Sequence, residues 1–266
     1  MTPIKLFWWN DHPNFGDAIN TDIVSHVSGR PVQWASPQDC ELLAIGSVMA
    51  FVAGVVHKKE GPPKTIWGSG VMDPTPGVTG YAQNDHVRVV SCRGPLSAIV
   101  TGHGDLPMGD PGLLADRVYG KVEKAHRIGV VPHHSQYRER DFINALRSDP
   151  RLTLIDVRNA DGGAVVRKIA ACEYIISSSL HGLIVADAYG IPNFWSDGPW
   201  VGKTNFKFLD YALSVGRSLL HPEPLEQAIA KINDRAFEPF WYLRHLEPVK
   251  DAIEAAFPKA MRAPGA

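Results

Sequence analysis

The sequence lacks the features of a nucleic-acid-binding, disulfide-bonded or zinc-binding protein. Its 27 Lys and Arg residues are matched by 28 Asp and Glu residues, so there is no basic excess for nucleic acid. Only three cysteines occur among the 266 residues, and none belongs to a C-x-x-C pair. We therefore expect neither a disulfide framework nor a zinc site, and we predict a reducing cytoplasm as the location.

Long hydrophobic segments are also missing. The N-terminal residues, MTPIKLFWW, do not contain the apolar run of a secretion signal. Leu42 to Val56 is uncharged and largely apolar, but it is shorter than the ~20 residues that a membrane-spanning helix needs. Gly46-Ser47 interrupts this stretch, so a buried strand followed by a core helix is the better interpretation.

Two glycine-rich segments approach nucleotide-binding motifs without matching them. Gly68-Ser69-Gly70 begins like G-x-G-x-x-G, but Asp73 stands where the third glycine is needed. Gly198 and Gly202 enclose three residues before Lys203, whereas a P-loop needs four. We therefore expect no nicotinamide, flavin or other cofactor and no nucleotide hydrolysis.

Strand-like and helix-like segments alternate along the chain. Short apolar runs rich in β-branched residues are followed by amphipathic segments, without hairpin signals, which predicts an α/β fold with parallel sheets. The polar segment KVEKAHR separates two Rossmann-like domains, at 1–122 and 123–237. A C-terminal helix at about 238–258 is a candidate to pack back on the first domain. The predicted strands are Ile4–Trp9, Leu42–Ile45, Thr65–Trp67, Val87–Cys92, Ile128–Val131, Leu152–Asp156, Tyr174–Ile176 and Asn193–Trp195.

The most informative stretch is Tyr174 to Pro192, YIISSSLHGLIVADAYGIP. A short apolar strand leads into three serines and then into an apolar segment of helical length, which Gly190 and Pro192 end. His181 is thus expected at a helix start, where unpaired N–H groups and the helix dipole favour phosphate or carboxylate. Alternatively, the serines only cap the helix and His181 is an ordinary surface residue. Taken alone, the turn favours this simpler interpretation.

Charged and polar residues also follow other predicted strands, where open α/β sheets bind ligands. Asn14 and Asp17 lie in the loop after the first strand. Arg93 stands between a strand and a helix, where a guanidinium can hold an oxyanion with two parallel hydrogen bonds. Each has a structural alternative, as a turn or cap residue for Asn14 and Asp17 and as a salt-bridge partner for Arg93.

The remaining candidates also carry two interpretations each. Asp110, in a tight polar turn, either orients Arg93 or caps the next helix. Lys207 follows the strand after His181 and is either directed into the same cleft or solvated. Adjacent residues of an extended segment point to opposite faces, so a metal pair at His133 and His134 is not expected, although one of them can face the crevice.

The order and spacing of these motifs resemble those of the polysaccharide pyruvyl transferase family, in particular its bacterial exopolysaccharide members of the succinoglycan ketolase kind. The resemblance implies a GT-B-like fold, with two Rossmann-like domains facing each other across a cleft. It also implies transfer of the pyruvyl group of phosphoenolpyruvate to sugar hydroxyls, usually as a ketal. The motifs are Asn14-Phe15-Gly16-Asp17, Gly68-Ser69-Gly70, Ser91-Cys92-Arg93-Gly94-Pro95-Leu96-Ser97, Gly109-Asp110-Pro111 and Ser179-Leu180-His181-Gly182.

We therefore predict a phosphoenolpyruvate-dependent transferase of exopolysaccharide biosynthesis. The resemblance assigns Arg93 and His181 to the donor site, and His181 is the predicted general acid because imidazole titrates near neutrality. The predicted partners are phosphoenolpyruvate and a saccharide acceptor, with a lipid-linked acceptor at the inner membrane face left open. The other expected residues are Ser179, Gly182, Lys207 and Lys203 for the donor, Asn14, Asp17 and His133 for the acceptor, and Asp110, Gly68 and Gly70 as structural support.

Two other functions stay open at this point. One is a GT-B-like glycosyltransferase that uses a nucleotide sugar, and the other is a non-catalytic sugar-binding relative. The glycosyltransferase would need an acidic residue in the second domain to hold a ribose, and the sequence offers no clear candidate.

Overall fold

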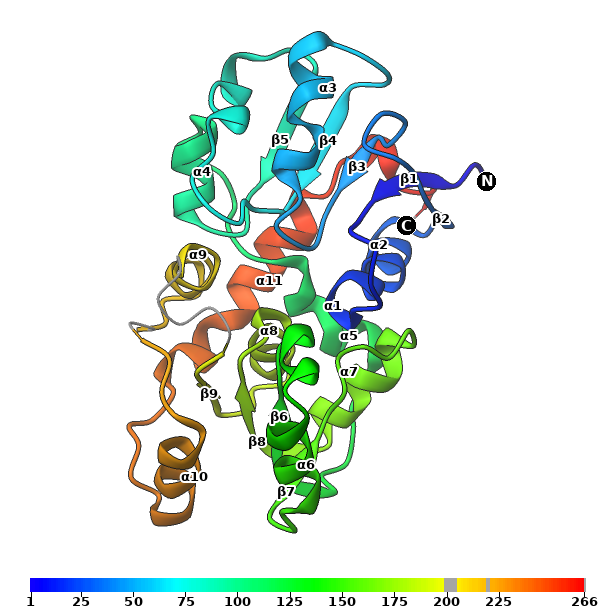
Figure 1. Ribbon diagram of the computed structural model, residues 1–266. Coiled ribbons are helices and arrows are strands. Elements are labelled where there is room, and N and C mark those ends of the chain that lie inside the picture. Colours follow the sequence, from blue (N-terminus) through cyan, green and yellow to red (C-terminus); the bar gives the residue numbers. More distant parts are fainter. Residues whose placement is uncertain (199–204, 219–220, 266) are drawn as a thin grey trace.

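The computed structural model describes residues 1–198, 205–218 and 221–265 as an α/β protein with two sheets (Figure 1). The first sheet has five strands in the order β2-β1-β3-β4-β5, and the second has four in the order β7-β6-β8-β9. All pairings between these named strands are parallel, which confirms the predicted parallel sheets. The strands are β1 (Ile4–Phe7), β2 (Val32–Trp34), β3 (Leu42–Leu43), β4 (Lys64–Trp67), β5 (Val87–Ser91), β6 (His126–Val131), β7 (Leu152–Leu154), β8 (Cys172–Ser177) and β9 (Asn193–Trp195).

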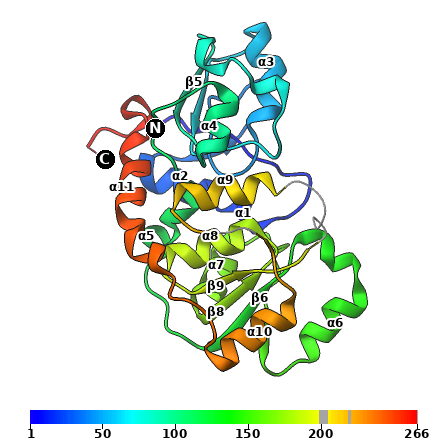
Figure 2. The ribbon, with the colours of Figure 1, turned by 90° about the vertical axis from the view of Figure 1, so that its left-hand side faces the viewer.

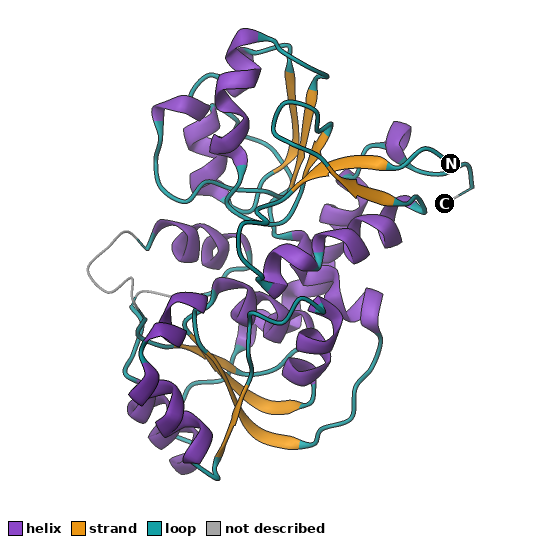
Figure 3. Cartoon of the chain, turned by 45° about the vertical axis from the view of Figure 1, so that its right-hand side comes forward, coloured by secondary structure: helices purple, strands orange, loops and turns teal. Residues whose placement is uncertain are grey.

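Helices lie between the two sheets and also cover their outer faces (Figure 3). On the outer side of the first sheet, α3 and α4 pack against one apolar cluster, and α6 and α10 cover the second sheet in the same way. The helices are α1 (Phe15–Ala18), α2 (Asn20–Ser28), α3 (Ala53–Lys58), α4 (Pro95–Thr101), α5 (Ala115–Tyr119), α6 (Arg140–Ser148), α7 (Gly162–Ala170), α8 (Leu180–Ala188), α9 (Phe206–Ser214), α10 (Leu225–Asp234) and α11 (Leu246–Ala256).

One continuous apolar cluster joins the two sheets. It contains Ile4 and Leu6 of β1, Val131 of β6 and Ile175 of β8, together with side chains of α2, α7 and α8. This cluster contains residues from both sides of the predicted domain boundary at residues 122 and 123. The two sheets therefore share one core, and the boundary stays a prediction. The consequence for function is that the two sets of strand ends are held in a fixed relation by shared packing.

The stretch from Leu42 to Val56 forms β3, a 3₁₀ turn at Met49–Val52 and the start of α3, close to the predicted strand and core helix. No helix in the described part of the chain has the length and apolar character needed to cross a bilayer. Strand β2 was not predicted, because its three residues, VQW, are half-buried or exposed at the sheet edge and show no apolar run.

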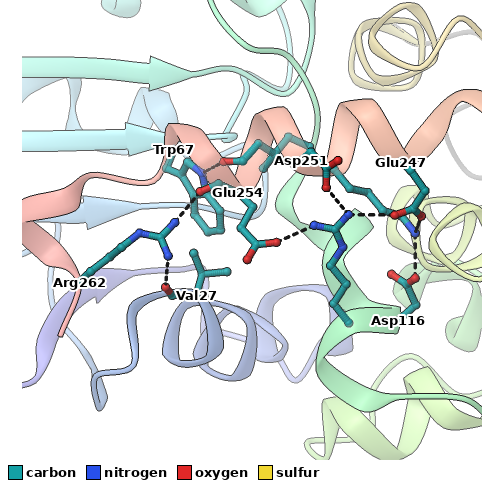
Figure 4. Close-up of polar contacts among 10 residues, drawn as sticks. Val27, Trp67, Asp116, Glu247, Asp251, Glu254 and Arg262 are labelled. Carbon is teal, nitrogen blue, oxygen red and sulfur yellow. Dashed lines mark hydrogen bonds and ion pairs between the residues drawn. The ribbon is translucent and has the colours of Figure 1, made fainter. Parts of the chain in front are cut away.

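Helix α11 ties the C-terminal segment to elements far away in sequence (Figure 4). The indole Nε1 of Trp67 donates to the Ile253 carbonyl at 2.7 Å, which attaches α11 to β4. Arg117 of α5 pairs with three carboxylates along one side of α11, those of Glu247, Asp251 and Glu254. Figure 2 shows α11 running alongside both sheets, so it braces the arrangement that holds the strand ends.

Replacing Ile253 by Ala should destabilise the protein strongly, because its side chain is fully buried in the cluster shared by both sheets. We expect the free energy of unfolding to fall by about 2–5 kcal/mol, as for other buried Ile-to-Ala changes. Asp251→Ala is the control on the same helix, because it removes only an exposed ion pair and should cost at most about 1 kcal/mol. Urea denaturation measures both, and equal losses would contradict the bracing role.

Candidate functional site

A pocket of about 270 Å³ lies where strand ends of both sheets meet. Its walls come from residues shortly after β1, β3, β4, β5, β6 and β8, which is where parallel sheets place ligands. Seven of the predicted site residues line it together: Asn14, Asp17, Arg93, His133, Ser179, His181 and Lys207. Gly182, Gly68, Gly70 and Asp110 do not line it, and Lys203 lies outside the described residues.

His181 reaches the pocket because of where it lies on α8. The other eight residues of this nine-residue helix are buried, so His181 is its single half-buried position, and it lines the pocket next to Leu180. Gly16 makes room for the ring, since a Cβ at that position would come within 2.0 Å of His181 Nδ1. The Nε2 atom is buried and has no hydrogen-bond partner among the described residues.

Burial, together with the nearby cations Lys207 and Arg93, lowers the pKa of His181 to about 3. The imidazole is therefore neutral near pH 7 in this structure. An anion bound in the pocket would act in the opposite direction, because a neighbouring negative charge favours the imidazolium form.

The side chains of Ser177 and Ser178, before α8, bind backbone groups at the end of β6 and do not cap the helix. Ser177 Oγ donates to the Val131 carbonyl at 3.0 Å, and Ser178 Oγ accepts from the His133 N–H at 2.9 Å. Ser179 is the N-cap residue, yet no side-chain capping bond from it occurs in the described chain. The simpler interpretation, in which the three serines only cap α8, is therefore wrong for these contacts.

Arg93 is completely buried and is held by a carboxylate 117 positions further along the chain. Its Nε and Nη2 lie 3.1 and 3.0 Å from Asp210 Oδ2, its Nη1 donates to Ser47 Oγ at 2.6 Å, and its Nη2 donates to the Val71 carbonyl at 2.6 Å. Asp210 also accepts from the backbone N–H and hydroxyl of Ser97 at the start of α4. Arg93 therefore has a fixed orientation, and its edge at Nη1 is directed toward a hydroxyl on the pocket wall.

Asp110 takes the capping alternative. Its Oδ1 accepts from the Gly112 N–H at 2.9 Å, while Asp210 is the carboxylate that contacts Arg93.

Two glycines near the site allow neighbouring residues to pack closely against the backbone. A Cβ on Gly70 would lie 2.5 Å from Arg93 Cζ, and one on Gly68, whose φ is +74°, would lie 2.3 Å from Pro111 Cδ.

Asp17 and Lys207 are two pocket residues whose pKa values are shifted toward neutrality. Burial raises the pKa of Asp17 to about 7, Asp110 adds to the rise, and Lys207 opposes it. Burial and Arg93 lower the pKa of Lys207 to about 8, against the carboxylates of Asp17 and Asp73. Because each lies in the field of the other, the two titrate as a pair.

His133 and His134 both line the pocket, with ring centroids 4.1 Å apart. The premise that an extended backbone would send the two rings to opposite faces is wrong, because the chain leaves β6 at Val131 and a 3₁₀ turn begins at His134. His133 Nδ1 lies 2.9 Å from Ser135 Oγ and caps this turn. Burial, together with His134 and Lys207, lowers the pKa of His133 to about 3.

Sequence reasoning missed several residues of the site. Asp210 could be suspected only as a carboxylate on the buried face of α9, between Phe208 and Tyr211. Trp9 and Phe51 were assigned to a strand and a core helix, yet both line the pocket. Ser47 was interpreted as an interruption of an apolar run, and it is the hydroxyl partner of Arg93.

Comparisons with known proteins find one matching family model and several similar chains. The family model described as polysaccharide pyruvyl transferase matches residues 81–197, which include Arg93 and His181. The succinoglycan biosynthesis protein ExoV of Rhizobium meliloti is 28% identical over 217 residues, which are 79% of this chain and 64% of ExoV, less than two thirds of its length. Uncharacterized protein L143 of Acanthamoeba polyphaga mimivirus is 25% identical over 217 residues, 80% of this chain and 74% of that protein.

Among solved structures, the functionally uncharacterized protein KP1_0663 of Klebsiella pneumoniae is similar with a TM-score of 0.49 and 8% identity. The match covers 79% of this chain and 87% of that one.

Removing the Asp210 carboxylate should destabilise the protein, because it leaves Arg93 buried without its counter-charge. For Asp210→Ala we expect a loss of about 3–5 kcal/mol in the free energy of unfolding, as for other broken buried ion pairs. Asp149→Ala is the control, since its pair with Arg151 is exposed and should contribute at most about 1 kcal/mol. Thermal and urea unfolding measure the difference. An Asp210→Ala protein as stable as the control would refute the proposed anchoring of Arg93.

Proposed function

We propose that the chain is a member of the polysaccharide pyruvyl transferase family, whose model matches residues 81–197, and that it transfers the pyruvyl group of phosphoenolpyruvate to hydroxyls of a saccharide, as a ketal. The observation that supports this best is the pocket itself, in which Arg93, His181 and Lys207 converge from elements of both sheets. We also propose a GT-B-like arrangement in which 1–122 and 123–237 form the two lobes. The reaction belongs to exopolysaccharide biosynthesis in the bacterial cytoplasm, with a lipid-linked acceptor at the inner membrane face as one form of the substrate.

The donor suits the charge of the pocket. Phosphoenolpyruvate carries a carboxylate and a phosphate on three carbons, and the pocket offers a buried guanidinium, a half-buried ammonium and the start of α8. Arg93 binds an anionic group of phosphoenolpyruvate through Nη1. The Ser47 hydroxyl, which accepts a hydrogen bond from Nη1 in this structure, can rotate and donate to the same anionic group. Lys207 binds the second anionic group and stabilises the phosphate as it leaves.

The chemistry requires one proton to be added and two to be removed. A proton adds to the methylene carbon of the donor and makes it a methyl group, while a sugar hydroxyl bonds to the neighbouring carbon and loses its proton. The bond from that carbon to the phosphate oxygen then breaks, and a second hydroxyl closes the ketal with loss of its own proton. Overall, one donor and one diol yield one ketal and one phosphate.

His181 and Asp17 divide this proton transfer. His181 is neutral in the empty pocket, takes up a proton when the dianionic donor binds, and delivers it to the methylene carbon. Asp17 lies in the same pocket beside Asn14 and accepts the proton of the attacking hydroxyl. Its raised pKa suits this role, because a base works best when its pKa lies near the working pH.

The direct test is incubation of the purified protein with phosphoenolpyruvate and a panel of mono- and disaccharides. We expect phosphate release together with a saccharide product whose mass has increased by one pyruvyl ketal. His181→Ala should bind the donor and lower turnover by about 10²–10⁴-fold, the usual range for loss of an acid–base group. Donor binding is followed by thermal shift, because a ligand at 100 times its Kd stabilises by about 2.7 kcal/mol. A shift with nucleotide sugars and none with phosphoenolpyruvate would overturn the proposal in favour of a glycosyltransferase.

The pH dependence of kcat/KM should be bell-shaped. Asp17 must be ionised to act as a base, so activity rises with pH through about 7. Lys207 must be charged to hold an anion, so activity falls with pH through about 8. Asp17→Asn should flatten the acid limb, and the donor's own phosphate, which titrates alike in both proteins, cancels in this comparison. Asp105→Asn, in an exposed loop, is the control. An unchanged acid limb in Asp17→Asn would exclude Asp17 as the base.

A further inference from the structure

The pocket has two kinds of wall. Asp17, Arg93, His181 and Lys207 form a charged floor, whereas Trp9, Val48, Phe51 and Met72 form an apolar side. Phe51 is 46% exposed and Met72 is 43% exposed, although large apolar side chains are usually buried. A doubly anionic three-carbon donor is held by the floor and has no apolar face to cover this side. The apolar side therefore fits a different molecule.

Trp9 and Phe51, which we call the aromatic shelf, are held in place from behind. Their ring centroids are 5.0 Å apart, and Phe51 also lies 5.7 Å from the ring of Phe7, which is buried. The two residues follow β1 and β3, which are neighbours in the sheet. The indole of Trp34 donates to the Trp8 carbonyl at 3.0 Å and fixes the chain just before Trp9. The shelf is thus supported by contacts with neighbouring residues.

A pyranose ring matches this combination of walls. Its axial C–H bonds make one face apolar and able to stack on an aromatic ring, while its hydroxyls point outward from the edge. With the ring on the shelf, the hydroxyl edge can point toward Asn14 and Asp17, which line the same pocket as Trp9. A flat stacking contact fixes the height and tilt of the ring, which decides which hydroxyl reaches the donor.

We propose that the aromatic shelf is the acceptor subsite, and that Trp9 and Phe51 bind one pyranose ring of the saccharide by stacking. This inference rests on the proposed function for the identity of the substrate. It goes beyond that function by naming the residues that orient the acceptor and select its hydroxyls. Neither residue takes part in the chemistry, so they act by binding and positioning.

The kinetic test compares Trp9→Ala and Phe51→Ala with the wild type on a saccharide that the wild type pyruvylates. We expect KM for the saccharide to rise about tenfold or more, which corresponds to about 1.4 kcal/mol of lost stacking. KM for phosphoenolpyruvate should change less than about twofold, since the floor is intact. Phe51→Tyr keeps a ring and should restore the saccharide KM. Trp241→Ala removes an exposed tryptophan that does not line this pocket and serves as the matched control.

A binding test separates failure of the shelf from failure of the proposed function. Saturation-transfer NMR with methyl pyranosides of glucose, galactose and mannose, without donor, should show transfer to ring C–H protons in the wild type. Trp9→Ala should abolish the signal and Trp241→Ala should keep it, whether or not pyruvyl transfer occurs.

Three results would overturn the proposal that the aromatic shelf is the acceptor subsite. The first is absence of transfer to all three pyranosides in the wild type, and the second is an equal rise of both KM values in the shelf variants. The third is loss of binding to phosphatidylglycerol vesicles in those variants with an unchanged saccharide KM, which would assign the shelf to a lipid surface.

Discussion

The buried ion pair between Arg93 and Asp210 is the contact on which the site depends. Both side chains are fully buried, and the two residues are separated by 117 positions in the chain. A lone buried guanidinium would be strongly destabilising, so Arg93 can stay in the pocket only because Asp210 neutralises it and the Ser47 and Val71 oxygens accept its other N–H groups. Asp210 also accepts from Ser97 and so joins α9, after the second sheet, to α4 of the first. Binding and architecture thus share one interaction.

The second constraint is the burial of α8. A helix that is apolar on nearly every side must lie inside the protein, and α8 lies in the cluster that joins the two sheets. Its N-terminal end is therefore brought to the strand ends, with His181 as the position left open to the pocket. Gly16 completes the arrangement, because any side chain there would collide with the ring. The neutral state of His181 follows from this burial and from the cations beside it.

Much of the fold was predictable from the sequence because it depends on local patterns. Parallel sheets follow from apolar strand-length runs that alternate with helices, and Asn14, Arg93 and His181 meet because each follows a strand of such a sheet. Contacts that depend on distant segments were not predictable. Nothing near Asp210 indicates that it pairs with Arg93.

Side-chain exposure was equally invisible in the sequence. Phe51 belongs to an apolar run most of whose members are buried, and the pattern cannot show that one ring faces a pocket. The directions of the His133 and His134 rings were misjudged because the backbone does not stay extended after β6. It enters a 3₁₀ turn at His134, which brings the two rings together.

The central claim is that one pocket holds a doubly anionic three-carbon donor between Arg93, Lys207 and His181. A crystal structure of the protein with phosphoenolpyruvate bound tests this most directly. The account predicts that the donor lies in the pocket, with an anionic group replacing Ser47 at Arg93 Nη1 and the methylene carbon next to the His181 ring. A donor bound elsewhere, for example in the separate pocket lined by Arg138 and Arg158, would contradict it.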